Sequence, residues 1–412
     1  MNERALSSLE VRAEIGSSDT GVRVVLVPGG RAGAIPLRSA QTGNVAAGLV
    51  VEPRFGWSGV GNVLTQTGWA AAPEFLEGPL VPGSGREVPP WVIAGPVLAR
   101  IGELLDSLRR GYHAKEELLR QPRGRIVWNR YISESLTSGR WGSLPCRYPE
   151  LATDPLLRRM ARWGLERVRL ELVTAGGRDP VARLLVSVAD ELLFRVRDVL
   201  PLMPRRADLE RIEVVDRLLQ TALRRGLEAL GWVVEERGLG GGREMDGLAW
   251  SLPLHQLWEH YVEVIARREA ALVGGNVRVG RKRETVFPLE WSDPSHRSLG
   301  HLVPDIVVFT SKAVHVIDAK YKAHLAELDE RGWVRFTDDV REAHRADVHQ
   351  VLAYASLYTA DEVIASLVYP LRRATFEALA RRGRDRSVAH LLHGGRRVRV
   401  ELRGVPFGTV ET

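Results

Sequence analysis

Cysteine, lysine and long apolar runs are all scarce in this 412-residue chain. The single cysteine, Cys146, excludes an intramolecular disulfide framework and a cysteine-rich zinc module. No apolar run approaches the roughly 20 residues that a membrane-spanning helix needs. The first residues, MNERALSSLE, lack the basic-then-apolar layout of a signal peptide. These absences favour a cytoplasmic protein that has no membrane partner.

A nucleotide-binding phosphate loop is also absent from the sequence. The pattern G-x-x-x-x-G-K-[ST] does not occur, so a nucleotide-driven motor would have to be a separate polypeptide. The eleven histidines show no spacing typical of zinc ligands. The length predicts two or three domains, and a net charge of +7 permits contact with polyanions without demonstrating it.

Lysine is rare, although the chain is basic. Five of the 58 basic residues are lysines, which leaves 58 − 5 = 53 arginines. Lysine is a compact point charge, whereas arginine is a planar fork that hardly ever loses its proton. A lysine retained next to acidic residues, as in Asp318-Ala319-Lys320, therefore indicates a position where the type of cation matters.

The stretch 301–322, HLVPDIVVFTSKAVHVIDAKYK, predicts two apolar strands joined by a short polar turn. Strand side chains alternate between faces, so Asp318 and Lys320 share one face. In a hairpin, Asp305 at the start of the first strand lies near Asp318 at the end of the second. Carboxylate oxygens suit Mg²⁺, and a neighbouring lysine can orient a water and offset charge on a phosphate. This arrangement resembles the metal site of the PD-(D/E)xK nucleases; the alternative is a solvated strand end.

A helix predicted before this hairpin adds one further acidic candidate. In LPLHQLWEHYVEVIARREAAL the apolar positions recur with helical spacing, and Glu259 lies at the edge of that stripe. Glu259 is either a third acidic group directed at the metal or an ordinary surface glutamate. The apolar positions of the stripe are Leu254, Leu257, Trp258, Tyr261 and Ile265.

A second predicted helix, ADVHQVLAYASLY, follows the hairpin. Its polar face carries Asp347, Gln350, Tyr354 and Tyr358, and the opposite face is apolar. Gln350 and Tyr354 either support the lysine and bond phosphate oxygens, or belong to an exposed polar face.

The fold class that we predict is α+β with several domains. Residues 1–88 read as a β-rich N-terminal domain, residues 89–237 as a mainly helical, arginine-rich middle domain, and residues 245–412 as an α/β domain like that of restriction endonucleases. Aromatic residues lie among the arginines of the middle domain, a composition that fits either nucleic-acid binding or a solvated helical surface. These aromatic residues are Trp128, Tyr131, Trp141 and Tyr148.

Taken together, these motifs resemble the McrC family, the nuclease subunit of McrBC-type modification-dependent restriction systems. The likeness rests on LPLHQLWEHYV with its Trp258-Glu259 pair, on VPDIVVF and HVIDAKYK, and on ADVHQVLAYASLY with Gln350 and Tyr354. It extends more weakly to RRGYHAKEELLRQPRGRI, LPCRYPELATDPLLRRM and VVEPRF. The last of these departs from the family, which usually has lysine where this chain has Arg54.

The resemblance implies Mg²⁺-dependent endonucleolytic cleavage of DNA, with Mn²⁺ as a substitute, in complex with an AAA+ GTPase of the McrB type that recognises modified cytosine. Asp305, Asp318 and the main-chain carbonyl of Ala319 would bind the metal, and Glu259 would complete the site directly or through water. Lys320 would position the attacking water, and Gln350 and Tyr354 would support it. The N-terminal half would dock on the motor.

Two other functions remain open from the sequence. One is a RecB-like exonuclease that works with a helicase, because that group shares the Gln/Tyr helix. The other is a non-catalytic adaptor that stimulates a motor NTPase. The presence of all four candidate residues argues against this, because a site that had lost its activity would have no need of them: Glu259, Asp305, Asp318 and Lys320.

Overall fold

The computed structural model describes most of the chain, in two compact units. Residues 1–84 and 248–412 form the first unit, and residues 85–247 form the second. The described residues are 2–18, 21–69, 71, 73–76, 81–82, 89–108, 110–176, 179–205, 207–209, 221–234, 249–292, 298–323, 325–326, 337–393 and 396–408. None of the helices in these ranges combines the length and the hydrophobicity that crossing a bilayer requires.

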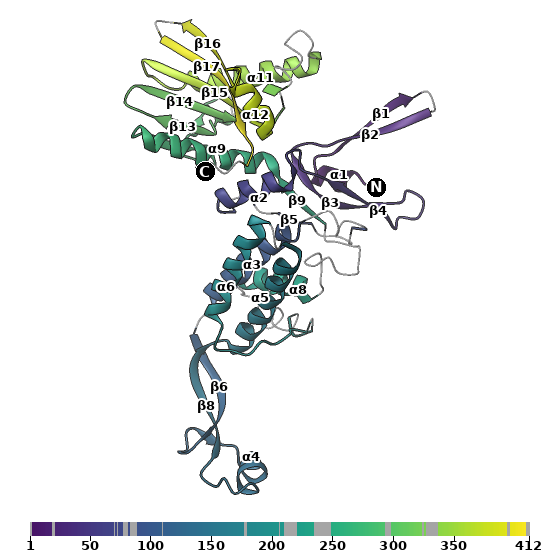
Figure 1. Ribbon diagram of the computed structural model, residues 1–412, viewed down its shortest axis with the longest axis vertical. Coiled ribbons are helices and arrows are strands. Elements are labelled where there is room, and N and C mark those ends of the chain that lie inside the picture. Colours follow the sequence, from purple (N-terminus) through teal and green to yellow (C-terminus); the bar gives the residue numbers. More distant parts are fainter. Residues whose placement is uncertain are drawn as a thin grey trace. The chain divides into compact units, whose positions relative to one another are not determined.

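The N-terminal part of the first unit is built on a four-stranded sheet with the strand order β4-β3-β9-β5 (Figure 1). The prediction that this region is rich in strands agrees with the four strands between residues 12 and 51. The elements are α1 (Glu3–Ser8), β1 (Arg12–Ser18), β2 (Gly21–Val27), β3 (Arg31–Arg38), β4 (Val45–Val51), α2 (Gly56–Gln66), β5 (Glu74–Phe75) and β9 (Trp250–Pro253).

The C-terminal part of the first unit contains a six-stranded mixed sheet with the order β10-β13-β14-β15-β17-β16. Strand β15 is parallel to β14 and β17, and the other neighbours are antiparallel. The elements are α9 (Leu254–Leu272), β10 (Asn276–Val279), η3 (Gly280–Lys282), β11 (Phe287–Pro288), β12 (His301–Leu302), β13 (Ile306–Phe309), β14 (Ala313–Ala319), α11 (Asp338–Ala355), β15 (Glu362–Leu371), α12 (Arg373–Ala380), β16 (Arg386–His393) and β17 (Arg396–Pro406).

The sequence pattern predicted the β13–β14 part of this sheet. The predicted hairpin is confirmed as β13 and β14. Strands β15 and β17 extend the sheet beyond it. A parallel neighbour cannot be reached by a tight turn, so the chain passes from β14 to β15 through α11. The helix that was predicted ahead of the hairpin is α9.

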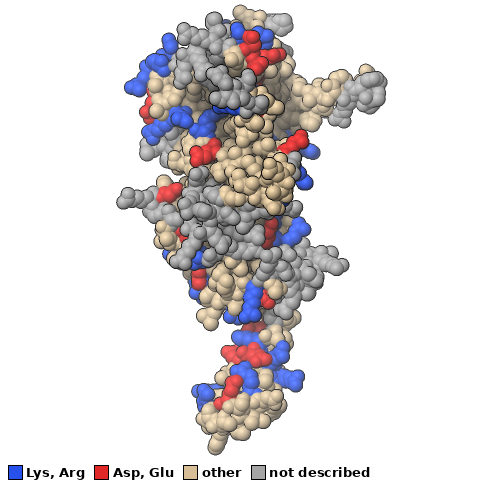
Figure 2. Space-filling model, turned by 90° about the vertical axis from the view of Figure 1, so that its right-hand side faces the viewer, with Lys and Arg blue, Asp and Glu red and all other residues tan. Residues whose placement is uncertain are grey.

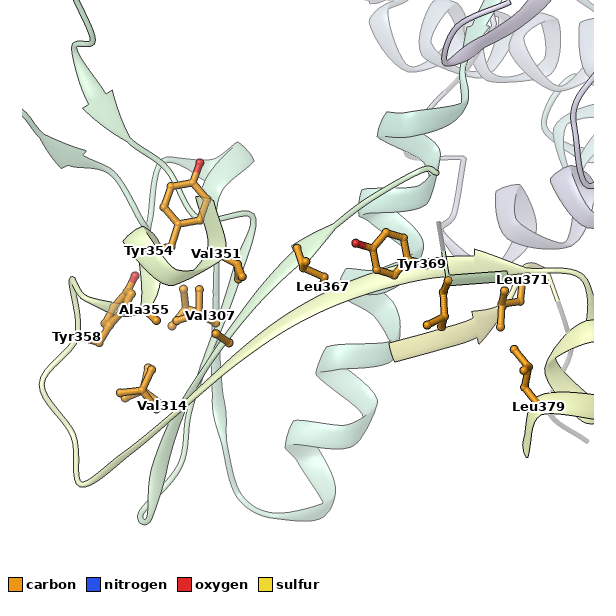
Figure 3. Packing of buried hydrophobic residues seen from close by; sticks show 14 residues of the cluster. Val307, Val314, Val351, Tyr354, Ala355, Tyr358, Leu367, Tyr369, Leu371 and Leu379 are labelled. Carbon is orange, nitrogen blue, oxygen red and sulfur yellow. The ribbon is translucent and has the colours of Figure 1, made fainter. Parts of the chain in front are cut away.

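Helix α11 packs on the sheet through a continuous apolar core (Figure 3). Val314 and Val316, which alternate along β14, share this core with Val351 of the helix. Tyr354 and Tyr358 are buried in it as well. The prediction that both tyrosines lie on the polar face of the helix was therefore wrong in part: their rings contribute apolar area to the core.

The second unit combines helices with a three-stranded sheet of order β6-β8-β7. Its elements are α3 (Trp91–Ser107), β6 (Arg110–Leu119), β7 (Arg125–Ile126), α4 (Trp128–Arg130), η2 (Tyr131–Leu136), β8 (Leu144–Thr153), α5 (Pro155–Gly176), α6 (Pro180–Arg195) and α8 (Thr221–Val234). The mainly helical composition predicted for residues 89–237 omits this sheet. Strand β6 contains good helix formers, but it pairs with β8 over ten residues, and such long-range pairing overrides local propensity.

Many arginines of the second unit are engaged in ion pairs. Arg130 contacts Glu116 at 3.1 Å and Glu134 at 2.9 Å, and Arg158 contacts Asp198. Basic and acidic side chains are interspersed over the β6 and β8 region on the face shown in Figure 2. For these residues the structure favours a solvated, ion-paired surface over a continuous basic track.

The predicted domain limits at 88/89 and 237/245 lie near the limits of the second unit, residues 85–247. The β-rich residues 1–84 share a unit with the C-terminal residues because β9 pairs with both β3 and β5. Whether three parts fold independently stays a prediction.

Candidate active site

The hairpin of β13 and β14 brings two aspartates together. Ile306 is paired with Ile317, so Asp305, one residue before, and Asp318, one residue after, lie opposite each other. The N–H of Ala319 donates a hydrogen bond to Asp305 Oδ2 at 2.9 Å. Asp318 is 1% exposed. The sequence thus predicted the approach of these two carboxylates from strand periodicity and turn length.

Negative charge accumulates at this end of the sheet. Burial and the charges of Asp318 and Glu259 raise the pKa of Asp305 well above its usual range. Burial also raises the pKa of Glu259, and Asp318 adds to this rise although nearby cations oppose it. Carboxylates whose ionised forms are disfavoured in this way are a donor set that a divalent cation would stabilise.

The ligand set that the structure offers is smaller than the one predicted. Among the residues that the structure describes, no three His, Cys, Asp or Glu side chains lie close enough together to hold one ion. Two carboxylates suffice for a typical Mg²⁺ site, where waters and substrate phosphates complete the coordination. Asp305 and Asp318 fit this requirement. Glu259 is half-buried on α9 and fits the water-mediated form of its predicted role better than direct ligation.

Lys320 is held firmly beside the aspartates. Its Nζ lies 2.7 Å from Asp318 Oδ2 and donates a hydrogen bond to Gln350 Oε1 at 2.8 Å. Burial lowers the pKa of Lys320, but the charge of Asp318 and the hydrogen bond to it outweigh burial, so the pKa is raised overall. This position suits an ammonium group that donates hydrogen bonds to a water or to a phosphate oxygen.

Gln350 and Tyr354 complete a short chain of hydrogen bonds. Gln350 Nε2 donates to the Tyr354 hydroxyl at 2.9 Å, while its Oε1 accepts from Lys320. Because Tyr354 is anchored in the core at 8% exposure, it fixes the amide and, through the amide, the lysine. The structure thus brings Gln350, Tyr354, Lys320 and both aspartates to one place.

One ion pair of this region was missed by the sequence reasoning. Lys322 Nζ lies 2.7 Å from Asp347 Oδ2, and Asp347 is 5% exposed. Lys320 Nζ also lies 3.8 Å from Asp347 Oδ1, so the two lysines share the field of one buried carboxylate. The available signal was spacing: Lys322 lies two residues after Lys320, and Asp347 lies three residues before Gln350, the partner of Lys320.

Comparison with known proteins assigns the chain to a family. The model of the family described as "McrBC 5-methylcytosine restriction system component" matches residues 102–370, more than half of the chain. The chain therefore belongs to the McrBC restriction system component family, which confirms the resemblance seen in the motifs. No curated protein is similar enough to count as a match.

Two solved structures from Thermococcus gammatolerans are similar to the chain at 15% identity. A chain of the refined half-complex from the tetradecameric assembly of McrB AAA+ hexamers with bound McrC aligns with a TM-score of 0.40, covering 95% of this chain and 80% of that one. A chain of the cryo-EM McrBC complex aligns with a TM-score of 0.27, covering 60% and 68%. Family membership rests on the match to the family model.

Proposed function

We propose that this chain is the Mg²⁺-dependent DNA endonuclease subunit of a McrBC-like, modification-dependent restriction system. The observation that carries the proposal is the meeting of Asp305, Asp318 and Lys320 at one end of the β13–β14 hairpin, with Lys320 held by Gln350. Family membership supports the type of system. The order of α9, β10, β13, β14, α11 and β15 supports a fold of the PD-(D/E)xK type.

Asp305 and Asp318, with the main-chain carbonyl of Ala319, would hold Mg²⁺ or Mn²⁺, and Glu259 would act on the same ion through water. When bound, the ion would supply Lewis-acid stabilisation of charge on the phosphate. Lys320 would donate hydrogen bonds to the attacking water and to a phosphate oxygen while the P–O bond breaks. Gln350 and Tyr354 would keep the ammonium in place, so that little reorganisation is needed during reaction.

The partner that we infer is an AAA+ GTPase of the McrB type, acting with this chain on modified DNA in the cytoplasm. The chain has no phosphate loop of its own, and the similar solved assemblies contain McrB AAA+ hexamers. The N-terminal half offers a contact surface, since Trp128 and Trp141 are 59% and 69% exposed near the tip of the β6–β8 hairpin.

Replacing both Trp128 and Trp141 by alanine should weaken association with the motor by roughly tenfold or more, because exposed aromatic side chains dominate protein interfaces. Titration of the partner's GTPase activity measures this. The control is Leu392→Ala, which removes an equally exposed apolar side chain, 76% exposed, from β16. A double variant that stimulates the motor like the parent protein would place the docking surface elsewhere.

The test of the proposed function uses a covalently closed circular plasmid. With the partner, GTP and Mg²⁺, the chain should linearise a plasmid containing 5-methylcytosine and leave an unmodified one intact. An exonuclease of the RecB type needs a DNA end and would leave both circles uncut while degrading the linear form. The Asp318→Asn protein serves as the inactive control.

A further inference from the structure

A basic turn is attached directly to the main chain of Asp305. Strand β10 ends where Val279 pairs with Ile306, and the N–H of Gly280 then donates to the Asp305 carbonyl at 2.8 Å. The next three residues, Arg281, Lys282 and Arg283, are all exposed cations. A Cβ on Gly280 would lie 2.6 Å from the Pro304 carbonyl oxygen, so only glycine lets the turn approach this closely.

Arg283 occupies a conformation that is unfavourable for it. Its φ is +61°, in the left-handed region that side chains other than glycine rarely adopt. The turn is closed by a hydrogen bond from Arg283 N to Gly280 O at 2.8 Å. Glycine would occupy this position without strain. Residues with strained backbones cluster at functional sites, and this favours a functional role for the Arg283 side chain.

The guanidinium group of Arg281 is held by the buried carboxylate of Glu263. Its Nε and Nη2 lie 2.8 Å and 2.6 Å from Glu263 Oε2, while Arg267 binds the other oxygen of the same side chain. One carboxylate thus serves two guanidinium groups, and a positive charge remains. Arg281, Glu263, Glu259 and Asp305 line one pocket of about 220 Å³, so Arg281 borders the same space as Asp305 and Glu259.

We propose that the turn 280–283 binds a backbone phosphate of the DNA strand that enters the Asp305–Asp318 site. Arg281 is a guanidinium fixed at the wall of the pocket by Glu263, and Lys282 and Arg283 are the exposed cations that follow it in the turn. Lys282 and Arg283 are both exposed to solvent. The identity of the ligand as DNA rests on the proposed function; the phosphate chemistry follows from the turn.

The test is binding of a short duplex DNA by the full chain in the presence of a chelator, measured over a range of salt concentrations. Arg283→Gly should weaken binding roughly tenfold at 0.1 M salt and reduce the slope of log K against log salt by about 1, as loss of one phosphate contact requires. The same variant should unfold at the parent's temperature or higher, since glycine relieves the strain. Arg281→Gln is the second variant, read by the same change in slope.

The matched control is Lys312→Ala, which removes an exposed cation from the β13–β14 turn and should change neither affinity nor slope. Parent-like affinity and slope in both Arg283→Gly and Arg281→Gln would overturn the proposal. If the chain binds DNA through this turn but does not cleave it, the proposed nuclease function fails while the phosphate site stands.

Discussion

Replacing Lys320 by alanine should lower the rate of DNA cleavage by roughly two to four orders of magnitude. Lys320 is the only described cation within hydrogen-bonding distance of Asp318, and the contact is 2.7 Å. Its ammonium is partly buried and is held in place by a hydrogen bond to Gln350. A water molecule that fills the space in the alanine variant carries no charge, so it would not replace the electrostatic effect of the ammonium. The effect should fall on the chemical step and leave association with the motor unchanged.

The rate should be measured in single turnover, with the partner and Mg²⁺ in excess, so that product release does not mask the chemistry. Lys322→Ala is the matched control. It removes a lysine two residues away that pairs with Asp347 and not with an aspartate of the candidate metal site. The mechanism would have to be abandoned if Lys320→Ala cleaved within a few-fold of the parent protein.

Asp305→Asn should abolish divalent cation binding and yet leave the cation-free protein as stable as the parent, or more stable. Burial, and then the charges of Asp318 and Glu259, raise the pKa of the Asp305 carboxyl, so its ionised form is disfavoured in the absence of a cation. The amide removes the charge but keeps an oxygen that accepts the hydrogen bond from Ala319 N. A carboxylate that lowers the stability of the cation-free protein but is needed to bind the cation is typical of a functional site.

Two measurements separate these effects. Calorimetric titration with Mg²⁺ or Mn²⁺ should show a site in the parent and none in the variant. At a cation concentration of 100 times Kd the parent should gain about 2.7 kcal/mol of unfolding free energy, and the variant should gain none. Asp338→Asn, which changes a 94% exposed carboxylate at the start of α11, should behave like the parent.

These titrations also decide between a nuclease and a non-catalytic adaptor. If the chain is a non-catalytic adaptor, it has no need of a cation, and the parent protein should show no cation site that depends on Asp305. Equal cation binding by the parent and by Asp305→Asn would remove Asp305 from the proposed metal site and would favour the adaptor.

The residues closest to the chemistry were predictable because their arrangement is local. Asp318 lies at the end of β14 and Lys320 just beyond it, and the short turn of the hairpin brings Asp318 back beside Asp305. Gln350 and Tyr354 were predicted on one helix face by the same kind of periodic argument. The burial of Tyr354 was not predicted, because helical periodicity shows which residues share a face and does not show what that face packs against.

The sequence by itself determined the hairpin, the face shared by Asp318 and Lys320, and the use of lysine in a chain that otherwise employs arginine. Only the tertiary structure decided that Lys322 pairs with Asp347, that Gly280 of the turn 280–283 donates a hydrogen bond to Asp305, and that β9 pairs with the N-terminal strands, which places them in one unit with the C-terminal residues. The physical reason is distance along the chain. Strand and helix periodicity act between neighbouring residues, whereas these contacts depend on how complete elements pack together.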